Sequence, residues 1–450
     1  MNPLPLSELA ALCGAPPPAR GGDTAVSRVS KDTRTLAAGD LYFALRGESF
    51  DGNAFAREAA ARGAAGAVLD DPAAAREVPS DFPVILVEDG AAALHRLAAA
   101  WRDRLGLRAV CITGSNGKTS TKEFTAAVLS SRFPTTKTEG NLNNHIGLPL
   151  TILAAETGHK AAVWEIGMNH PGEIAPLAAI AKPDAAIVTN IGVAHIEYMG
   201  SREAIAREKS ALLAALPPAG TAIFPGSDDF ADTLAASTRA RVVRTGGPDL
   251  HAADLRISAD ETAFTLVVDG ARIPARVPAP GAHMVANALL AIAAGLALGL
   301  APEECVAGLA TARNASGRLA RKSLRDVLFL DDTYNANPDS MVAALGVLAG
   351  IPGGKKIAVL GRMGELGSHA DEGYRRTGIA AAASAGALIA VGPETAPLAE
   401  AAEAAGLAHV VRAGDVAAAA AALREIAGAG DVVLVKGSRS ARMERVLEEF

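Results

Sequence analysis

The stretch from residue 109 to residue 130, AVCITGSNGKTSTKEFTAAVLS, constrains the fold of this chain more than any other. Four apolar residues typical of a buried strand lead into a glycine-rich turn, and an apolar-periodic segment typical of a helix follows. A strand, a glycine-rich loop that ends in Lys-Thr, and a helix together surround a polyphosphate with backbone N–H groups. The stretch therefore predicts that the chain binds ATP. The predicted nucleotide contacts are Gly114, Ser115, Asn116, Gly117, Lys118, Thr119 and Ser120.

Two side chains of this loop carry specific chemistry. Lys118 would reach the β- and γ-phosphates, and the hydroxyl of Thr119 would bind Mg²⁺. The longer pattern G-x-x-x-x-G-K-[ST] requires glycine at position 112, where Ile112 stands, so only its shorter core is present. The alternative is an ordinary glycine-rich turn before a helix. The strand before the loop and the helix after it favour the phosphate site.

Composition and charge exclude several classes of protein. The 450 residues are too many for one ordinary core, which predicts two to four domains. The net charge of −6, without a long basic run, argues against a general nucleic-acid binder. Three distant cysteines predict neither a disulfide framework nor a Cys-x-x-Cys metal site. The start of the sequence lacks a basic leader, and no apolar run is long enough for a membrane span, so we expect a soluble cytoplasmic protein.

Hydrophobic periodicity predicts an α/β chain with three parts. Residues 1–86 are expected to form a small α/β unit, and residues 87–315 a mainly parallel sheet flanked by helices. Within that part, the period changes to two near residues 254–278, which predicts a small antiparallel patch with one hairpin at Asp269-Gly270. A long, buried helix should follow over residues 283–300. Residues 316–450 are expected to form a second doubly wound domain, with strands predicted at residues 327–330, 356–360, 388–391, 409–411 and 432–435.

Two strand ends in the middle part present side chains that can bind a metal ion. Glu165 follows one apolar strand, and His195 follows the next. Alone, each is more readily explained as a turn or capping residue. Because both follow strands beside a phosphate loop, we expect them to take part in metal binding. Lys209, by contrast, reads on its own as a solvated lysine on a helix.

Polar residues also follow strands in the later part of the chain. Asn287 lies on the predicted buried helix, where an amide needs a partner. Asp332 opens a polar run, and Lys436 follows the last predicted strand. Such groups in two domains predict a site between the domains. Early in the chain, residues 30–34 form a turn that could hold a uridine or a phosphate, although, taken alone, it is more readily explained as an ordinary surface turn.

Seven motifs, taken together and in order, resemble those of the Mur ligases of peptidoglycan synthesis over nearly the whole chain. They are TGSNGKT at 113–119, GNLNNHIGLP at 140–149, EIGMN at 165–169, NIGVAH at 190–195, DTYNANP at 332–338, LGRMGELG at 360–367 and VKGSR at 435–439. The resemblance implies an N-terminal domain that holds a UDP-sugar, a central ATPase domain and a C-terminal Rossmann-like domain.

The resemblance also implies roles for particular residues. Lys118, Glu165, His195, Lys209 and Asp332 match catalytic positions. Of these, Glu165, His195 and Lys209 join Thr119 at the magnesium sites, and Lys209 matches a lysine that is carbamylated in several relatives. Asn287, Arg318 and Asp332 match nucleotide contacts. The matching substrate contacts are Ser30, Thr33, Arg34, Asn141, Asn144, Asn335, Asn337, Lys436 and Ser438.

Within the family, the resemblance favours a branch that joins D-alanyl-D-alanine to UDP-N-acetylmuramoyl-tripeptide through an acyl phosphate. The run at residues 334–338 favours this branch, and the Asp-Asn-Pro-Arg motif of relatives that select a diamino acid is absent. Asn53 stands where relatives often carry histidine. The alternatives are a ligase that adds a single amino acid, such as another Mur ligase or a folylpolyglutamate synthase, and a binding module that has lost ligation. The family also leads us to expect a monomer.

Overall fold

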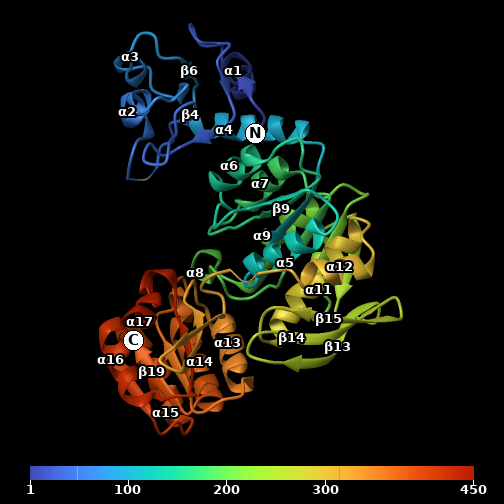
Figure 1. Cartoon of the computed structure of the whole chain (residues 1–450), viewed down its shortest axis with the longest axis vertical. Helices are drawn as coiled ribbons and strands as arrows, with labels where there is room; N and C mark the ends of the chain where they lie inside the picture. Colours follow the sequence, from blue (N-terminus) through green and yellow to red (C-terminus); the bar gives the residue numbers. More distant parts are fainter. Residues whose placement is uncertain (48, 314) are drawn as a thin grey trace. The chain divides into compact units, whose positions relative to one another are not determined.

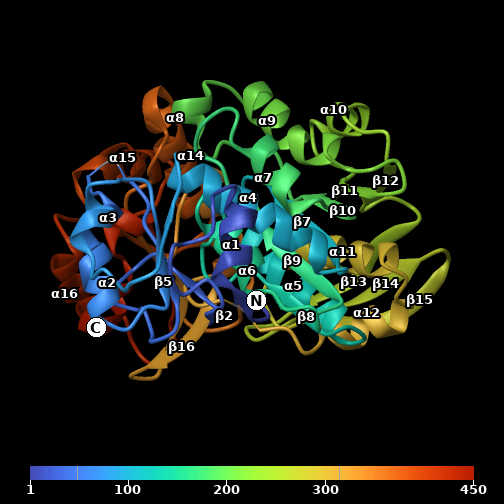
Figure 2. The same ribbon diagram turned by 90° about the horizontal axis from the view of Figure 1, so that it is seen from above.

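The computed structural model describes residues 1–47, 49–313 and 315–450. Figure 1 labels their helices and strands, and Figure 2 gives the same ribbon from above. Contacts divide the chain into two compact units that alternate along the sequence. The first comprises residues 1–111, 133–167 and 175–184, and the second comprises residues 112–132, 168–174 and 185–450.

Three sheet-centred α/β domains confirm the predicted fold class. The N-terminal domain contains a parallel sheet in the order β3-β4-β5-β6 and a separate antiparallel pair, β1 with β2. Tyr42 and Leu69 are among the buried residues that pack this small core. Its strands are β1 (Leu4–Pro5), β2 (Ala25–Val26), β3 (Val29–Ser30), β4 (Leu41–Phe43), β5 (Gly66–Leu69) and β6 (Val84–Leu86). Its helices are α1 (Leu6–Cys13), η1 (Gly52–Phe55), α2 (Ala56–Ala61) and α3 (Ala74–Glu77), and α4 (Gly90–Arg104) leads out of it.

The central sheet has six strands in the order β12-β11-β10-β7-β9-β8. The chain moves from β7 to one side for β8 and β9, and then to the other side for β10, β11 and β12. This reversal next to β7 is a topological switch point, and open α/β sheets bind ligands beyond the carboxyl ends of the strands at such a point. The strands are β7 (Arg108–Thr113), β8 (Thr135–Lys137), β9 (Ala161–Glu165), β10 (Ala185–Val188), β11 (Thr221–Pro225) and β12 (Arg241–Thr245).

The inner strands β9 and β10 are apolar and buried, as expected of a parallel sheet covered on both faces. The helices of this part are α5 (Lys118–Ser130), α6 (Gly147–Ala154), α7 (Ile174–Ala181), α8 (Ile196–Met199), α9 (Arg202–Ala214), α10 (Ala231–Ala236), α11 (Ala282–Ala297) and α12 (Pro302–Leu309). The predicted long, buried helix is α11, and it packs closely against α5.

The antiparallel patch is larger than predicted. β13 (Leu250–Ile257), β14 (Thr262–Val268) and β15 (Ala271–Val277) lie side by side as a three-stranded meander (Figures 1 and 2). The predicted turn between β14 and β15 is present, with φ of 47° at Asp269 and 81° at Gly270. A positive φ at both residues suits a tight hairpin. A second connection joins β13 to β14, so the prediction of one hairpin was wrong.

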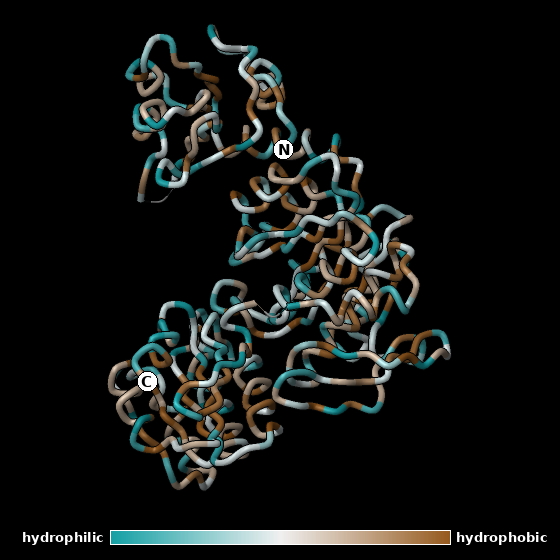
Figure 3. Tube along the Cα trace, viewed as in Figure 1, coloured by the Kyte–Doolittle hydropathy of each residue, from teal (hydrophilic) through white to brown (hydrophobic). Residues whose placement is uncertain are grey.

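The C-terminal sheet has the order β16-β17-β21-β18-β19-β20, with β16 antiparallel to β17 and the other pairs parallel. In Figure 3 its inner strands are predominantly brown, that is, apolar. The strands are β16 (Ala320–Leu324), β17 (Val327–Asp332), β18 (Lys356–Leu360), β19 (Ala387–Val391), β20 (Val410–Ala413) and β21 (Val432–Lys436). The helices are α13 (Pro338–Gly350), η2 (Gly367–His369), α14 (Ala370–Ser384), η3 (Pro393–Thr395), α15 (Ala396–Ala404), α16 (Val416–Ile426), η4 (Arg439–Ala441) and α17 (Glu444–Glu449).

Two strands of the C-terminal sheet differ from the prediction. β16 was not predicted, and its residues Arg321 and Lys322 are exposed at the edge of the sheet. β17 continues to Asp332, two residues beyond the predicted end, so Asp332 is the last residue of a strand rather than the first residue of a loop. Of the helices in the part of the chain that the structure describes, none has both the length and the apolar character to cross a membrane.

Candidate functional site

The predicted phosphate loop lies between the carboxyl end of β7 and the first residue of α5, Lys118. Gly114 and Gly117 have φ values of 146° and 79°, which favour glycine. A Cβ at position 114 would lie 1.8 Å from the Thr189 hydroxyl, and one at position 117 would lie 2.6 Å from Asn287 Oδ1. Neither site has room for a side chain. The bare backbone and the helix N-terminus therefore form a cradle of the kind that binds phosphate.

The loop after β10 fastens this cradle. The Ser115 N–H donates to the Asn190 carbonyl at 3.0 Å, and the Asn116 N–H donates to Asn190 Oδ1 at 3.0 Å. Thr189 donates its hydroxyl to the Asn116 carbonyl at 2.5 Å. The N–H groups of Ser115 and Asn116, both predicted nucleotide contacts, are thus used within the protein.

Two lysines belong to this region. Lys118 Nζ donates to the Gly114 carbonyl at 2.8 Å and to the Ser115 carbonyl at 3.3 Å. Lys209 on α9 is 1% exposed, so the expectation of a solvated lysine was wrong. Burial lowers the pKa of Lys209 well below its usual value, the nearby Lys118 lowers it further, and Glu208 opposes the change. A lowered pKa increases the share of neutral, nucleophilic amine near neutral pH.

His195 precedes α8 with a φ of 63°, a conformation that is uncommon for a residue other than glycine. Its Nδ1 lies 2.5 Å from Oε2 of Glu365, which comes from the loop after β18. The hydrogen bond to His195 lowers the pKa of Glu365. Glu365 was not predicted as a site residue, although it lies within one of the recognised motifs and follows a strand.

Glu165 ends β9 and belongs to the other compact unit. It is 3% exposed, its Oε1 accepts a hydrogen bond from Asn143 Nδ2 at 2.9 Å, and its N–H donates to the Thr138 hydroxyl at 2.9 Å. Asn143 was missed by the prediction. Its neighbour Asn144, predicted to contact substrate, accepts with its Oδ1 the N–H groups of residues 146 and 147 at the start of α6. Asn141 is exposed.

A second group of charged residues forms at the ends of β17 and β21. Lys436 Nζ lies 2.5 Å from Asp332 Oδ2 and donates to the Asn335 carbonyl at 2.9 Å. His283, at the start of α11, is partly buried near this ion pair, and neither periodicity nor motif had singled it out. Burial lowers the pKa of His283, whereas Asp332 raises it and Lys436 lowers it. Arg318 stacks its guanidinium over the Tyr334 ring at 4.4 Å.

Several other predicted substrate contacts are used in local structure. Asn335 Oδ1 accepts the N–H of Ala336 at 2.9 Å, and Asn337 Oδ1 caps α13 by accepting the N–H of Ser340 at 3.0 Å. Ser438 is buried, and its hydroxyl lies 3.2 Å from that of Ser440.

The N-terminal turn is held together by its own side chains. Ser30 donates its hydroxyl to the Asp32 carbonyl at 3.2 Å, and Thr33 is buried. Arg34 pairs with Asp32 at 2.6 Å, and this hydrogen-bonded ion pair lowers the pKa of Asp32 to about 2. Asn53, which stands where relatives often carry histidine, is buried and donates to Asp70 Oδ1 at 2.6 Å.

The donor set suits a magnesium ion that is bound mainly through phosphates and water. Across residues 1–47, 49–313 and 315–450, no three or more histidine, cysteine, aspartate or glutamate side chains form a ready-made metal site. Mg²⁺ commonly binds through one or two protein groups together with substrate phosphates, so an all-protein cage is not required. The cradle at Gly114 and Gly117, closed to side chains, fits the phosphates.

Three family models match the chain. They are "Mur ligase family, catalytic domain" at residues 25–102, "Mur ligase middle domain" at residues 112–295, and "Mur ligase, glutamate ligase domain" at residues 317–439.

Individual relatives match along nearly the whole chain. The UDP-N-acetylmuramoyl-tripeptide–D-alanyl-D-alanine ligase of Escherichia coli is 38% identical over 95% of this chain and 94% of its own length. The crystal structure of MurF from Acinetobacter baumannii is similar with a TM-score of 0.91 at 33% identity, covering 100% of this chain and 99% of that one. MurF ligase from Thermotoga maritima, solved in complex with ADP, gives a TM-score of 0.84 at 28% identity, covering 94% of this chain and 97% of that one.

Proposed function

The chain belongs to the Mur ligase family, and from this premise we propose that it joins D-alanyl-D-alanine to UDP-N-acetylmuramoyl-tripeptide, with ATP as a substrate. The product is the UDP-N-acetylmuramoyl-pentapeptide precursor of peptidoglycan. The observation that carries the proposal is the 38% identity to a ligase of this name over nearly its full length, together with a phosphate cradle at the switch point of the central sheet.

The reaction proceeds in two steps. The γ-phosphoryl group of ATP passes to the terminal carboxylate of the tripeptide, which gives an acyl phosphate and ADP. The amine of D-alanyl-D-alanine then attacks the carbonyl carbon, loses a proton, and the C–O bond to phosphate breaks. A carboxylate is a poor electrophile, and phosphorylation supplies its leaving group. Transfer of this kind depends chiefly on positioning and on stabilising the charge of the phosphoryl group.

The loop and the residues around it bind and orient the nucleotide. The glycines of the cradle admit the phosphates, Lys118 balances their charge, and Asn287, Arg318 and Asp332 complete the nucleotide contacts. The support for Asn287 is its side chain, which lies against Gly117 of the loop. Because the N–H groups of Ser115 and Asn116 are already bonded to Asn190, we assign phosphate binding to other groups of the loop.

Thr119, Glu165, His195 and Lys209 would hold Mg²⁺, which neutralises phosphate charge when it is bound. The burial and lowered pKa of Lys209 support its carbamylation, because only a neutral amine reacts with CO₂. The carbamate would then add oxygen ligands of the kind that Mg²⁺ prefers.

Residues of all three proposed domains would bind the acceptor substrates. Ser30, Thr33 and Arg34 are assigned to the UDP-sugar. The peptide contacts are assigned to Asn141, Asn144, Asn335, Asn337, Lys436 and Ser438. We place the domains at residues 1–86, 87–315 and 316–450, and we propose that the protein acts in the cytoplasm as a monomer.

The test is the mass of the nucleotide product after incubation with ATP, Mg²⁺, the UDP-tripeptide and D-alanyl-D-alanine. We expect a UDP-pentapeptide, with ADP and phosphate released only when both acceptors are present. If the mass of the UDP-tripeptide increases by a single amino acid instead, the proposal that D-alanyl-D-alanine is the substrate is refuted.

Lys118→Ala tests the nucleotide site, and Lys160→Ala, at an exposed lysine of the same domain, is the matched control. Loss of the Lys118 charge should lower kcat by about 10²-fold or more, as removal of a charge-stabilising donor does elsewhere. The Lys160 variant should keep wild-type turnover. Near-normal turnover in the Lys118 variant would sink the assignment of the loop.

A further inference from the structure

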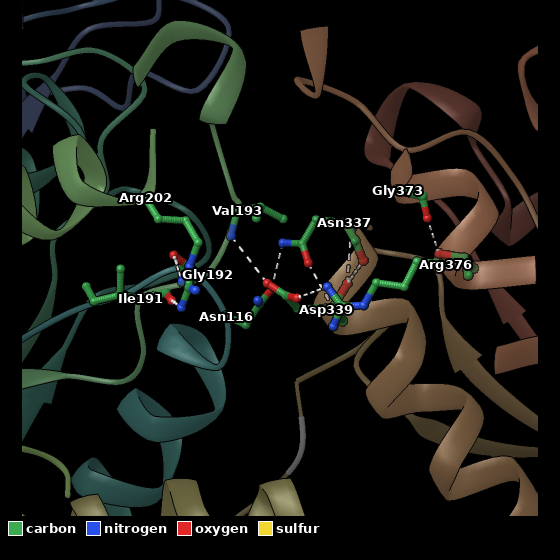
Figure 4. A network of polar contacts seen from close by, with 12 residues as sticks. Asn116, Ile191, Gly192, Val193, Arg202, Asn337, Asp339, Gly373 and Arg376 are labelled. Atoms are coloured by element: carbon green, nitrogen blue, oxygen red, sulfur yellow. Dashed lines mark hydrogen bonds and ion pairs between the residues drawn. The ribbon is translucent and has the colours of Figure 1, made fainter. Parts of the chain in front are cut away.

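The first turn of α13 contacts the nucleotide region from the C-terminal domain (Figure 4). Asn337 caps the helix with its Oδ1, and its Nδ2 donates to Oδ1 of Asn116 at 2.8 Å. The cap requires only the oxygen of the amide. The nitrogen of the same side chain therefore serves a separate contact with the phosphate loop.

Asp339, two residues later, makes a contact of the same kind with the loop after β10. Its Oδ2 accepts the N–H of Val193 at 3.2 Å, and its Oδ1 accepts Nη1 of Arg376 on α14 at 2.8 Å. A Cβ at Gly192 would lie 2.5 Å from Asp339 Oδ2, so glycine is needed for this approach. Arg376 binds the other oxygen of this carboxylate, as Figure 4 shows, so the two contacts together fix the direction of the Asp339 side chain.

In the loop after β10, three consecutive backbone N–H groups donate hydrogen bonds to side chains from three different segments of the chain. The N–H of Ile191 donates to Asp228 at 2.8 Å, the N–H of Gly192 donates to the Ser115 hydroxyl at 2.9 Å, and the N–H of Val193 donates to Asp339. The same loop runs on to His195. Its shape is therefore determined jointly by the central domain, the phosphate loop and the C-terminal domain.

We propose that Asn337 and Asp339, the α13 pair, are positioning residues through which the C-terminal domain sets the shape of the two loops that bind the nucleotide. The inference rests on the proposed function of those loops. Asn337 acts through Asn116 of the phosphate loop, and Asp339 acts through Val193 on the segment that leads to His195. Neither residue needs to touch the nucleotide. Because small displacements of positioned groups have large effects in such sites, Mg–ADP affinity depends on the α13 pair.

The experiment measures binding of Mg–ADP to the full-length chain by calorimetry, without either acceptor. Asp339→Ala removes the acceptor of the Val193 N–H, and Asn337→Ser keeps a helix cap but is too short to reach Asn116. Asp339→Asn retains one acceptor oxygen. The matched control is Asp371→Ala, because Asp371 pairs with Arg375 at 2.8 Å on the same α14.

We expect Asp339→Ala and Asn337→Ser to weaken Mg–ADP binding about tenfold each, the size of one lost charge-assisted or positioning hydrogen bond. Asp339→Asn should recover at least half of that loss on a logarithmic scale, and Asp371→Ala should bind as the wild type does. If Asp339→Ala fails to fold, as judged by thermal unfolding, Asn337→Ser and Asp339→Asn carry the test.

Wild-type affinity in both Asp339→Ala and Asn337→Ser would overturn the inference, and so would tighter binding, since the pair would then oppose the nucleotide-bound shape. The Lys118→Ala variant separates this result from a failure of the proposed function. If Lys118→Ala also binds Mg–ADP with wild-type affinity, the nucleotide site itself is wrongly placed.

Discussion

Replacing Gly114 with alanine tests whether the phosphate cradle requires a bare backbone. The added Cβ would meet the Thr189 hydroxyl at 1.8 Å, and Thr189 Cβ and N at 2.9 Å. The hydroxyl cannot simply rotate away without loss, because it donates to the Asn116 carbonyl. The alanine must therefore displace either the phosphate loop or the end of β10.

Two effects set the size of the change. A φ of 146° is essentially restricted to glycine, and holding alanine there costs about 1–3 kcal/mol. Overpacking against Thr189 adds about 1–3 kcal/mol. We expect the free energy of unfolding to fall by about 2–6 kcal/mol, with Mg–ADP affinity falling as the loop moves.

Gly106→Ala is the matched control. Gly106 has a φ of 57°, and nothing lies within 4 Å of the position that its Cβ would take. This variant should lose only the conformational cost of about 1–2 kcal/mol and should keep full nucleotide affinity. Urea unfolding followed by far-UV circular dichroism, together with Mg–ADP calorimetry, measures both quantities. If Gly114→Ala matches Gly106→Ala in both, the close approach of Thr189 to the loop is wrong.

Three further outcomes follow from burial and charge. A thiol reagent at pH 8 should label none of Cys13, Cys111 and Cys305 until the chain unfolds, since burial raises the pKa of each to about 12 and leaves little thiolate; rapid labelling of the native chain contradicts this. Lys209→Met should abolish turnover and, in bicarbonate-free buffer, raise the thermal midpoint, because burial lowers the pKa of Lys209 below 10.5 and so destabilises the folded wild-type protein. This destabilisation is absent above pH 10.5 and grows as the pH falls below it. The rise in thermal midpoint should therefore shrink towards pH 10.5, and a rise that stays constant contradicts the lowered pKa. Gly346→Ala, on an exposed position inside α13 with nothing within 4 Å, should stabilise by about 0.5–1 kcal/mol in urea unfolding, and a loss of stability there would show that the position is not open.

The strands that the sequence predicted are those with long apolar runs. β18 lies where it was predicted, at Lys356–Leu360, because a strand buried on both faces needs consecutive apolar residues. β8, β12 and β16 were missed for the opposite reason. They lie at the edges of their sheets and carry polar residues, so their pairing depends on neighbours that are distant in sequence.

The site shows the same division. The glycine-rich loop was predictable, because its conformation is encoded in adjacent residues. The contacts of Glu365 with His195 and of Asp339 with Val193 join residues far apart in sequence, and no local pattern indicates them. Asn144 lies in a recognised motif, but the motif does not indicate that its side-chain oxygen accepts the N–H groups at the start of α6. A sequence motif therefore identifies a candidate site residue, but it does not indicate which group that residue's side chain contacts.

The exposed, charged strand β16 has a consequence for the assembly of the C-terminal sheet. Without it, β17 would present the open hydrogen-bonding edge of an otherwise parallel sheet, with Phe329 and Leu330 in the middle of that edge strand. Such an edge can recruit a strand from another molecule, and charged side chains on an outer strand discourage that addition. Arg321 and Lys322 place two positive charges there, and Lys322 is tied to Asp331 of β17 at 2.7 Å. A fragment that begins at Val327 would lack β16, so we expect it to aggregate through the exposed edge of β17 rather than to unfold.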